Sequence, residues 1–287
     1  MKESILLKEI QLFLTRYCQQ ERHLSRLTIL SYRDTMKLFL NYLHGTKKIS
    51  LSKIELSELT YELVSEFLTY LEKKRGISVS TRNQRLCAIH SFLRYLLFKY
   101  PNCAGTISRT LNVPKKKVIK KPRSFLSPEE VEHLLKSVNR KNWIGERDYL
   151  LLDFCIRTGV RVSELVNIKV DDIILGKSPY VSVTGKGRKE RSIPIDRSFS
   201  STLSNWIQGN DLTSSSYLFS SMKGSRLSTD SIQYLLRKYV STSRRNSSLL
   251  SKKRISPHTL RHTTAMNLLS RGVDIQIIAL WLGHEQI

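Results

Sequence analysis

A basic stretch that contains two prolines divides this chain into parts with different patterns. Residues 104–124 carry seven Lys or Arg side chains and no Asp or Glu, and Pro114 and Pro122 interrupt any helix there. Such a composition is typical of an extended linker. We therefore predict two domains, over 1–103 and 125–287, each large enough to bury its own core.

The part before this linker predicts helices only. Its apolar side chains recur at spacings of three and four residues, which is the period of one helical face. Gly45 and Gly76 are expected to end two of the helices, and Ser80 is expected to cap a further helix that Pro101 closes. The first domain is therefore expected to be all-helical.

The part after the linker mixes helices with one β-hairpin. Ser127 is expected to cap a helix, a second helix covers about 145–158, and Gly159 ends it. Residues 180–184 and 191–195 alternate between apolar and polar side chains around a glycine-containing turn, which predicts two paired strands. The predicted fold class is therefore mainly α with a small β-hairpin or sheet.

The balance of charge indicates a polyanionic partner. The chain has 48 Lys and Arg against 24 Asp and Glu, a net charge of +24 and a pI near 10.1. A second basic block, 231–261, holds eight basic residues and no acid. Nucleic acid is the simplest partner, although either block could form no more than a solvated surface. The side chains expected to contact DNA are Arg82, Arg85, Lys115, Lys116, Lys117, Arg188, Arg244 and Arg245.

Other classes of protein are disfavoured by what the sequence lacks. The four cysteines, at positions 18, 87, 103 and 155, are isolated, which is typical of reduced thiols in a cytosolic setting. The N-terminus mixes Lys and Glu with its apolar residues, unlike a signal peptide. No run of about 18 apolar residues could span a membrane. We therefore expect a cytoplasmic protein with no membrane partner.

Short motifs in the second part carry side chains suited to a phosphodiester. Arginine and lysine neutralise the charge that develops on a phosphoryl group, and histidine moves protons without a metal ion. Taken singly, each residue has a simpler explanation, such as a helix cap or a solvated turn. The candidate catalytic residues are Arg161 in Thr-Gly-Val-Arg-Val-Ser-Glu-Leu, Lys186 in Thr-Gly-Lys-Gly-Arg-Lys-Glu-Arg, His258 and Arg261 in Pro-His-Thr-Leu-Arg-His, and His284 in Leu-Gly-His.

Two of the histidines have a spacing that zinc sites also use. His258 and His262 are four residues apart, so both lie on one face of a helix. The position after His258 is Thr259, where the helix of a zinc protease carries a glutamate. We therefore expect no metal, and no other cofactor, at this site.

Together these motifs resemble the signature boxes of the tyrosine recombinase (phage integrase) family, and within it the Xer-like bacterial branch. The order is the family's, and so are the approximate spacings: 25 residues from Arg161 to Lys186, 72 to His258, 3 to Arg261 and 23 to His284. The segments Thr-Ile-Leu-Ser-Tyr-Arg-Asp and Ser-Thr-Arg-Asn-Gln-Arg-Leu of the helical part are similar to the family's core-binding domain. The resemblance thus covers nearly the whole chain.

The resemblance implies a division of labour in the cleavage of one DNA strand. Arg161 and Arg261 would donate hydrogen bonds to the non-bridging oxygens of the scissile phosphate. Lys186, at the hairpin tip, would protonate the leaving 5′ oxygen. His258 would accept the proton of the attacking hydroxyl, and Glu164 would hold Arg161 or a neighbouring histidine in position.

The nucleophile that the resemblance implies has no counterpart in the sequence. His284 would add a hydrogen bond to the phosphoryl group, and the family's nucleophilic tyrosine would follow about nine residues later. The sequence ends at Ile287, and its last tyrosine is Tyr239. The expectation is a C-terminally shortened chain that binds DNA and does not cut it, because no phenolate can form the covalent intermediate.

The resemblance also implies an architecture and partners. A helical core-binding domain and a catalytic domain would form a C-shaped clamp around double-stranded DNA, with the linker along the backbone. Sister recombinase subunits would assemble into a tetramer, weakened here by the missing C-terminal helix. The implied function is site-specific recombination or integration of DNA, as in mobile elements. Two alternatives stay open: a non-catalytic, sequence-specific DNA-binding protein, and a basic scaffold that binds RNA.

Overall fold

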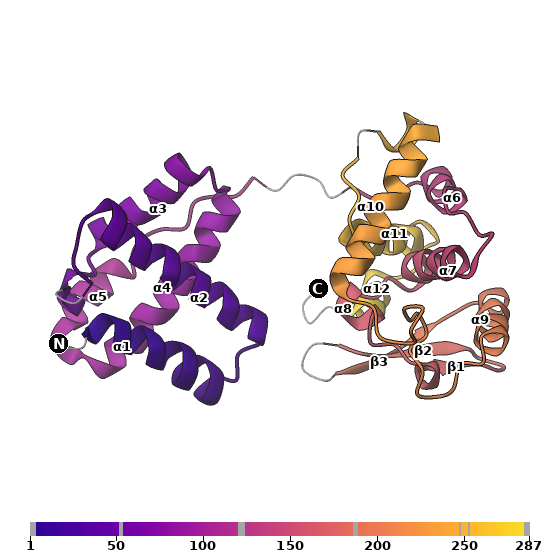
Figure 1. The fold of residues 1–287 in the computed structure, drawn as a ribbon, viewed down its shortest axis with the longest axis horizontal. Coiled ribbons are helices and arrows are strands. Elements are labelled where there is room, and N and C mark those ends of the chain that lie inside the picture. Colours follow the sequence, from indigo (N-terminus) through magenta and orange to yellow (C-terminus); the bar gives the residue numbers. More distant parts are fainter. Residues whose placement is uncertain are drawn as a thin grey trace. The chain divides into compact units, whose positions relative to one another are not determined.

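The chain divides into two compact units, residues 1–120 and 121–287, and each is described by itself. Helices dominate both units, and the second also contains a small sheet (Figure 1). This confirms the predicted fold class. The computed structural model describes residues 4–51, 54–119, 124–185, 189–246, 248–251 and 253–283.

The first unit is a bundle of helices around α4. Helices α2 and α3 both pack against α4, and the shared core contains the buried rings of Phe13, Phe67 and Phe92. The segments η1 and η2 are π-helical. The elements are α1 (Ile5–Leu12), η1 (Phe13–Glu21), α2 (Arg26–Asn41), η2 (Tyr42–Thr46), η3 (Leu56–Glu58), α3 (Tyr61–Arg75), α4 (Val79–Lys99), η4 (Pro101–Cys103) and α5 (Ala104–Thr110).

Two boundaries in the first unit differ from the expectation. Ser78, and not Ser80, caps α4, because its side chain accepts a hydrogen bond from the amide of Thr81 at 3.2 Å. Residues 104–110, which we expected to begin the linker, form α5, and Ile107 is buried in the core. The prolines and lysines that indicated a linker all lie beyond this helix, so the predicted boundary falls too early in the chain.

The second unit combines helices with a three-stranded antiparallel sheet in the order β1-β2-β3. The predicted hairpin is confirmed, with Val181 opposite Ile193 and both side chains buried. The third strand, β1, was not predicted, because two residues are too few to show alternation. The elements are α6 (Pro128–Lys136), α7 (Trp143–Thr158), α8 (Val162–Leu165), η5 (Val170–Asp172), β1 (Ile173–Ile174), β2 (Tyr180–Thr184), β3 (Glu190–Pro194), α9 (Arg197–Gly209), α10 (Thr229–Asn246), η7 (Ser248–Leu250), α11 (Pro257–Ser270) and α12 (Ile275–Leu282).

Helix α7 lies in the core of the second unit, with α11 packed against it. It ends at Gly159, as predicted, in a left-handed conformation with φ of +65°. A Cβ on Gly159 would lie 2.7 Å from Leu282 Cδ2, and the indole of Trp281 donates a hydrogen bond to the Thr158 carbonyl at 3.0 Å. Helix α12 therefore holds the end of α7 and sets the direction in which the chain leaves it.

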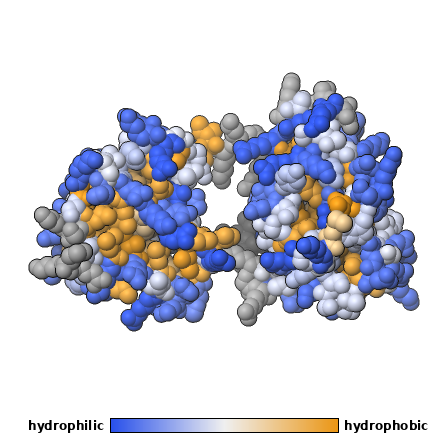
Figure 2. All heavy atoms as spheres, viewed as in Figure 1, coloured by the Kyte–Doolittle hydropathy of each residue, from blue (hydrophilic) through white to orange (hydrophobic). Residues whose placement is uncertain are grey.

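The surface of each unit is largely polar. Figure 2 shows hydrophilic side chains over much of the visible face, with smaller apolar patches between them. Among the residues that the structure describes, no helix combines the length and the apolar character needed to cross a bilayer.

Candidate active site

Arg161 lies where α7 has ended and α8 begins. It is the N-cap of α8, and Glu164 at the third helical position accepts a hydrogen bond from its amide at 2.8 Å. The same carboxylate accepts a second hydrogen bond from Arg161 Nη1 at 2.7 Å, in the arrangement expected of Glu164. The local sequence thus holds the guanidinium through its own helix cap, while 33% of the Arg161 side chain stays exposed.

Arg191 pairs with the same carboxylate, and the sequence reasoning did not single it out. Its Nη2 donates to Glu164 Oε2 at 2.8 Å and its Nη1 to Oε1 at 3.1 Å; the Glu164 side chain is buried, and 12% of the Arg191 side chain is exposed. On β3 it lies opposite Val183 and two residues before Ile193, both buried. The alternation of the strand therefore places Arg191 on the core-facing side, a signal that the sequence contains.

Arg261 is the most deeply buried arginine of the motifs that were predicted to form the site. It lies on α11 with 8% of its surface exposed, and its Nη1 donates to the Gly159 carbonyl at 2.7 Å. Burial, and then the positive charge of Arg161, lower the pKa of Arg261 to about 10. The guanidinium groups of Arg161 and Arg261 are therefore close enough to repel one another. Two such groups at this separation are suited to bind one anion together.

Three successive carbonyl groups at the end of α12 each accept a hydrogen bond from a different arginine. The last carbonyls of a helix lack partners within it and carry partial negative charge. The arginines therefore stabilise the helix end, and the helix end orients the arginines. The pairs are Arg191 Nε with Trp281 (2.9 Å), Arg261 Nη2 with Leu282, and Arg161 Nη2 with Gly283 (2.8 Å).

We call Arg161, Arg191, Arg261 and Glu164 the arginine cluster. Burial acts to raise the pKa of Glu164, but hydrogen bonds from Arg191 and Arg161 outweigh it and lower the pKa, so the carboxylate is ionised at neutral pH. One negative charge among three positive ones leaves the cluster with a net positive charge. Planar guanidinium groups held in this way match the geometry of a phosphate.

The remaining candidate catalytic residues are placed only in part. His258 lies in the first turn of α11, one turn before Arg261, and is exposed. Lys186 and His284 lie outside the described residues. The ring of His262 packs edge-on against Phe125, with centroids 6.2 Å apart. Within the described ranges no group of three or more His, Cys, Asp or Glu side chains could hold a metal ion.

The surroundings of Arg82 disfavour the expected contact with DNA. The Arg82 side chain is buried, donates a hydrogen bond to the Pro114 carbonyl at 2.9 Å, and lies 3.8 Å from a carboxylate oxygen of Glu72. Little of its guanidinium is left for a phosphate. Helical spacing put Arg82 on the polar face of α4, but the segment after α5 folds back over that face.

The other side chains expected to contact DNA have varied surroundings. Arg85 is half-buried and donates to the hydroxyl of Thr35 at 3.0 Å, and Lys116 pairs with Glu72 at 2.8 Å. The exposed residues of this set are Lys115, Lys116, Lys117, Arg244 and Arg245, of which Arg244 donates to the Leu250 carbonyl at 3.0 Å. Arg188 lies outside the described residues.

Comparison with known proteins covers both units. Residues 124–287 match the phage integrase family, and residues 10–99 match the phage integrase N-terminal SAM-like domain. A protein of Sinorhizobium fredii that carries the name integrase/recombinase y4rC is 39% identical over 286 residues, which cover all of this chain and 86% of the relative. A tyrosine recombinase of Pseudothermotoga lettingae is 30% identical, over 94% of this chain and 88% of the relative.

Solved structures share the fold at lower identity. The XerH site-specific recombinase bound to its difH substrate superimposes with a TM-score of 0.71 at 22% identity, over 95% of this chain and 77% of that one. A dimer of lambda integrase bound to a COC′ core site gives 0.72 at 17% identity, over 98% and 95%. The family match over more than half of the sequence, together with the relatives, shows that this chain belongs to the phage integrase family of tyrosine recombinases.

Proposed function

We propose that this protein acts in site-specific recombination of double-stranded DNA, and that the arginine cluster holds the scissile phosphate. One observation carries the proposal: Arg161, Arg191 and Arg261 all donate to the end of α12, while only Glu164 supplies a negative charge, paired with the first two. The cluster thus retains a net positive charge at a fixed place. The solved structures of similar fold are complexes with DNA, which supports the same partner. Both units would contact the duplex, as the family resemblance implies.

The proposed chemistry is transesterification at phosphorus. A tyrosine hydroxyl attacks the phosphate, the bond to the 5′ oxygen breaks, and a 3′-phosphotyrosine forms. Arg161 and Arg261 stabilise the charge on the non-bridging oxygens, at roughly 3 kcal/mol for each well-placed donor. His258 accepts the proton of the attacking hydroxyl, and Lys186 protonates the leaving oxygen. The phosphotyrosine bond conserves the energy for rejoining, so no ATP or metal is required.

The last tyrosine of the sequence, Tyr239, is not suited to act as the nucleophile. Tyr239 is buried and donates a hydrogen bond to Asp148 at 2.9 Å. Burial and this hydrogen bond raise its pKa, so formation of a phenolate there is disfavoured. We therefore propose that a polypeptide of residues 1–287 binds duplex DNA without cleaving it, and that cleavage needs a tyrosine from beyond Ile287. Its His284 would then donate to the phosphoryl group.

A second function follows from the same observation. Without a nucleophile the chain would act as a non-catalytic, sequence-specific DNA-binding protein that occupies a recombination site. Sister subunits on the same DNA are a further proposed partner, and lambda integrase has been solved as a tetramer on a Holliday junction. We also propose a cytoplasmic location, which the four free cysteines support.

Covalent capture distinguishes these functions. Residues 1–287, and the same chain extended by a segment with a tyrosine about nine residues after His284, are incubated with duplex DNA from the flanks of the gene. We expect both to shift the duplex on a native gel and only the extended chain to yield a DNA adduct that resists detergent. An adduct with residues 1–287 alone would show that the nucleophile is already present. Failure of both chains to bind duplex would exclude both functions.

A further inference from the structure

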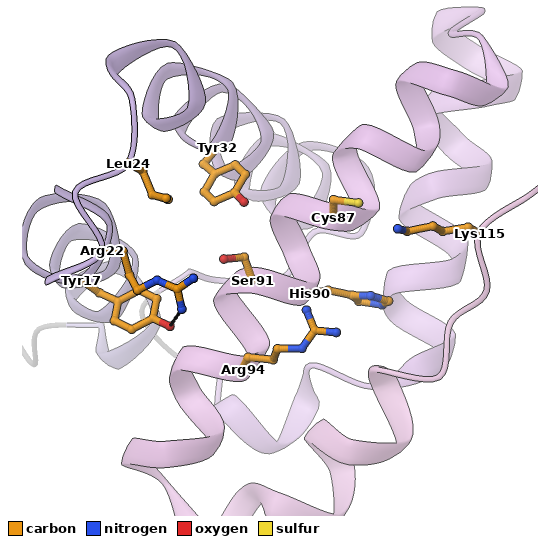
Figure 3. A pocket seen from close by; sticks show the side chains of 9 residues that line it. All are labelled: Tyr17, Arg22, Leu24, Tyr32, Cys87, His90, Ser91, Arg94 and Lys115. Carbon is orange, nitrogen blue, oxygen red and sulfur yellow. Dashed lines mark hydrogen bonds between the residues drawn. The ribbon is translucent and has the colours of Figure 1, made fainter. Parts of the chain in front are cut away.

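A cavity of about 420 Å³ lies in the first unit (Figure 3). Its walls come from four segments: η1 with the loop after it, α2, α4, and the strand-like segment after α5. The lining side chains are Tyr17, Arg22, Leu24, Tyr32, Cys87, His90, Ser91, Arg94 and Lys115. This volume lies in the range of small-ligand sites and can take a phosphate with part of the group that it esterifies.

The charged side chains of the cavity are all basic. Arg22, Arg94 and Lys115 line it and no carboxylate does. None of the three forms an ion pair with a carboxylate in the described part of the chain; Arg22 Nη1 makes a long hydrogen bond of 3.5 Å to the hydroxyl of Tyr17. Three cations gathered without a counter-charge repel one another, so the cavity favours an anion.

One polar atom of the wall is buried and has no partner. His90 is 8% exposed, and its Nε2 makes no hydrogen bond among the described residues. Burial, together with Arg94 and Lys115, lowers the pKa of His90, so the imidazole is neutral at pH 7. A buried polar atom without a partner is destabilising unless a water molecule or a ligand pairs with it. As an N–H group, Nε2 can donate to an anion beside Arg94, its neighbour in Figure 3.

The cavity is built on fixed elements. The segment with Lys115 is fastened to α4, since Asn83 exchanges two hydrogen bonds with the main chain of Lys116, at 2.8 and 3.0 Å. On the opposite wall, Tyr17 and Tyr32 stack on the buried ring of Phe13, with centroids 5.8 and 5.9 Å away. The main chain next to Lys115 and both aromatic rings are therefore held in place without a ligand.

We propose that this cavity binds a phosphate group, with charge from Arg22, Arg94 and Lys115 and a hydrogen bond from His90 Nε2. The source of the phosphate rests on the proposed function: it is a backbone phosphate of duplex DNA other than the scissile phosphate. A free phosphate or nucleotide offers the same chemistry and is the other source that an experiment must separate.

Salt dependence of duplex binding tests the first source. Neutralising one phosphate contributes about 0.9 to the slope of log Kobs against log salt. We expect Arg94→Ala to weaken duplex binding roughly tenfold and to reduce that slope by about 1. Arg75→Ala, which removes an exposed arginine of α3 outside the cavity, is the matched control and should change neither quantity appreciably. Equal effects of the two variants would overturn a backbone-phosphate site.

The role of His90 has its own variants. His90→Phe keeps a ring of similar size and removes the donor, so binding should weaken while the salt slope stays the same, because no charge is lost. His90→Gln retains an N–H group and should recover part of the binding. Thermal unfolding of each variant shows whether the fold is intact. If His90→Phe binds as tightly as the wild type at an unchanged melting temperature, His90 is not part of the site.

Titration with inorganic phosphate and a deoxynucleoside monophosphate, in the absence of DNA, tests the second source. Binding that is lost in Arg94→Ala and shifts the His90 ring signals in an NMR spectrum would assign a free-phosphate site. If neither probe binds, and Arg94→Ala reduces the slope of log Kobs against log salt for duplex DNA, the site binds a backbone phosphate. If neither the duplex titrations nor the phosphate titrations change in Arg94→Ala, the inference is overturned. A chain that fails to bind duplex yet binds phosphate here would refute the proposed function and leave the cavity assignment standing.

Discussion

At the scale of single residues, Glu164 is the counter-charge around which the candidate site is organised. It accepts hydrogen bonds from the amide and guanidinium of Arg161 and from both terminal nitrogens of Arg191, and only 4% of its side chain is exposed. A buried carboxylate with this many donors orients its partners as well as neutralising them. The positions of the two arginines thus depend on one side chain that would not itself contact the phosphate.

Replacing Glu164 by Gln should therefore destabilise the second unit. We expect Glu164→Gln to lower the free energy of unfolding by about 2–4 kcal/mol at pH 7, because positive charges remain buried without their counter-charge. All three tryptophans, at 143, 206 and 281, lie in this unit, so denaturant unfolding followed by tryptophan fluorescence reports on it.

A matched control variant and the pH dependence of stability test whether the loss comes from the charge of Glu164. Glu132→Gln removes a carboxylate of an exposed ion pair with Lys136 and should change stability by less than about 0.5 kcal/mol. The folded pKa of Glu164 is lowered, so its contribution is present above the unfolded pKa, about 4.3, and is lost as the pH falls through the folded value. The difference between wild type and Glu164→Gln should shrink accordingly below pH 4.

Arg161 should matter for chemistry more than for binding. In a chain extended to include the tyrosine, Arg161→Lys keeps the charge and loses the planar fork that can hold two oxygens. We expect the rate of adduct formation to fall about 100-fold or more, with duplex affinity changed less than tenfold. Quench-flow or timed gels of the covalent adduct, and gel shifts, measure the two quantities. An unchanged adduct rate would remove Arg161 from the catalytic assignment.

At the scale of elements, the candidate site depends on how α12 closes onto the end of α7. Gly159 combines a left-handed backbone with a close approach to Leu282, and its carbonyl accepts a hydrogen bond from Arg261. The carbonyls of Trp281 and Gly283, at the other side of this contact, accept from Arg191 and Arg161. A substitution at this junction should therefore change the positions of all three arginine side chains.

Two glycine substitutions separate the backbone effect from the packing effect. Gly272 in the same unit also has a positive φ, +79°, but no atom lies within 4 Å of the position of its Cβ. We expect Gly272→Ala to destabilise by about 1 kcal/mol, the strain of a left-handed alanine. Gly159→Ala should destabilise by an additional 1–3 kcal/mol or so, because Leu282 or α12 must move. If the two variants lose the same free energy of unfolding, measured by tryptophan fluorescence, then α12 moves aside at little cost.

In the first unit, α1 is joined to α4 through a buried carboxylate. Glu9 accepts hydrogen bonds from Tyr95 at 2.7 Å, from Lys99 at 2.7 and 2.8 Å, and from Tyr100 at 2.8 Å. Burial acts to raise the pKa of Glu9, but these hydrogen bonds, that of Lys99 first, prevail and lower it. The carboxylate is therefore ionised and holds the N-terminal helix in place.

Glu9→Gln should loosen this contact in a pH-dependent way. We expect a loss of about 1–3 kcal/mol at pH 7, since one charged acceptor is exchanged for a neutral amide. Because the folded pKa is lowered, the loss should disappear as the pH falls below about 4. The first unit has no tryptophan, so hydrogen exchange of the α1 amides is the measurement. The comparison variant, Glu62→Gln, breaks an exposed pair with Arg109 and should leave exchange nearly unchanged.

At the scale of the whole molecule, the net charge of +24 predicts binding dominated by the phosphate backbone. If six or more phosphates are neutralised, the affinity for duplex DNA should fall about a thousandfold or more between about 50 and 200 mM salt. Fluorescence anisotropy across that range measures it. A preference for one duplex sequence at constant salt supports recombinase or site-specific binding. Tighter binding to RNA at every salt concentration would favour the RNA-binding scaffold instead.

Features that depend only on neighbouring residues could be predicted from the sequence. The helical periods, the hairpin, the cap at Ser127 and the stop at Gly159 are local, because a helix or strand repeats its contacts every few residues. The spaced motifs around Arg161 and Arg261 identified the family, and the charge balance indicated the class of partner. Where a local reading went wrong, at residues 104–110, the neighbouring prolines and lysines outweighed a short helix in the prediction.

Which charged groups share a site depends on the packing of distant segments and could not be predicted from the sequence. Arg161 meets the Gly283 carbonyl 122 positions later, and the cavity unites Arg22, Arg94 and Lys115 from three segments. The burial of Arg82 likewise depends on a segment that folds back from beyond α5. Such contacts follow from how complete helices pack around a core, and no periodicity in the sequence encodes the distance between residues on different elements. The sequence therefore supplies the chemical groups, and packing decides which of them act together.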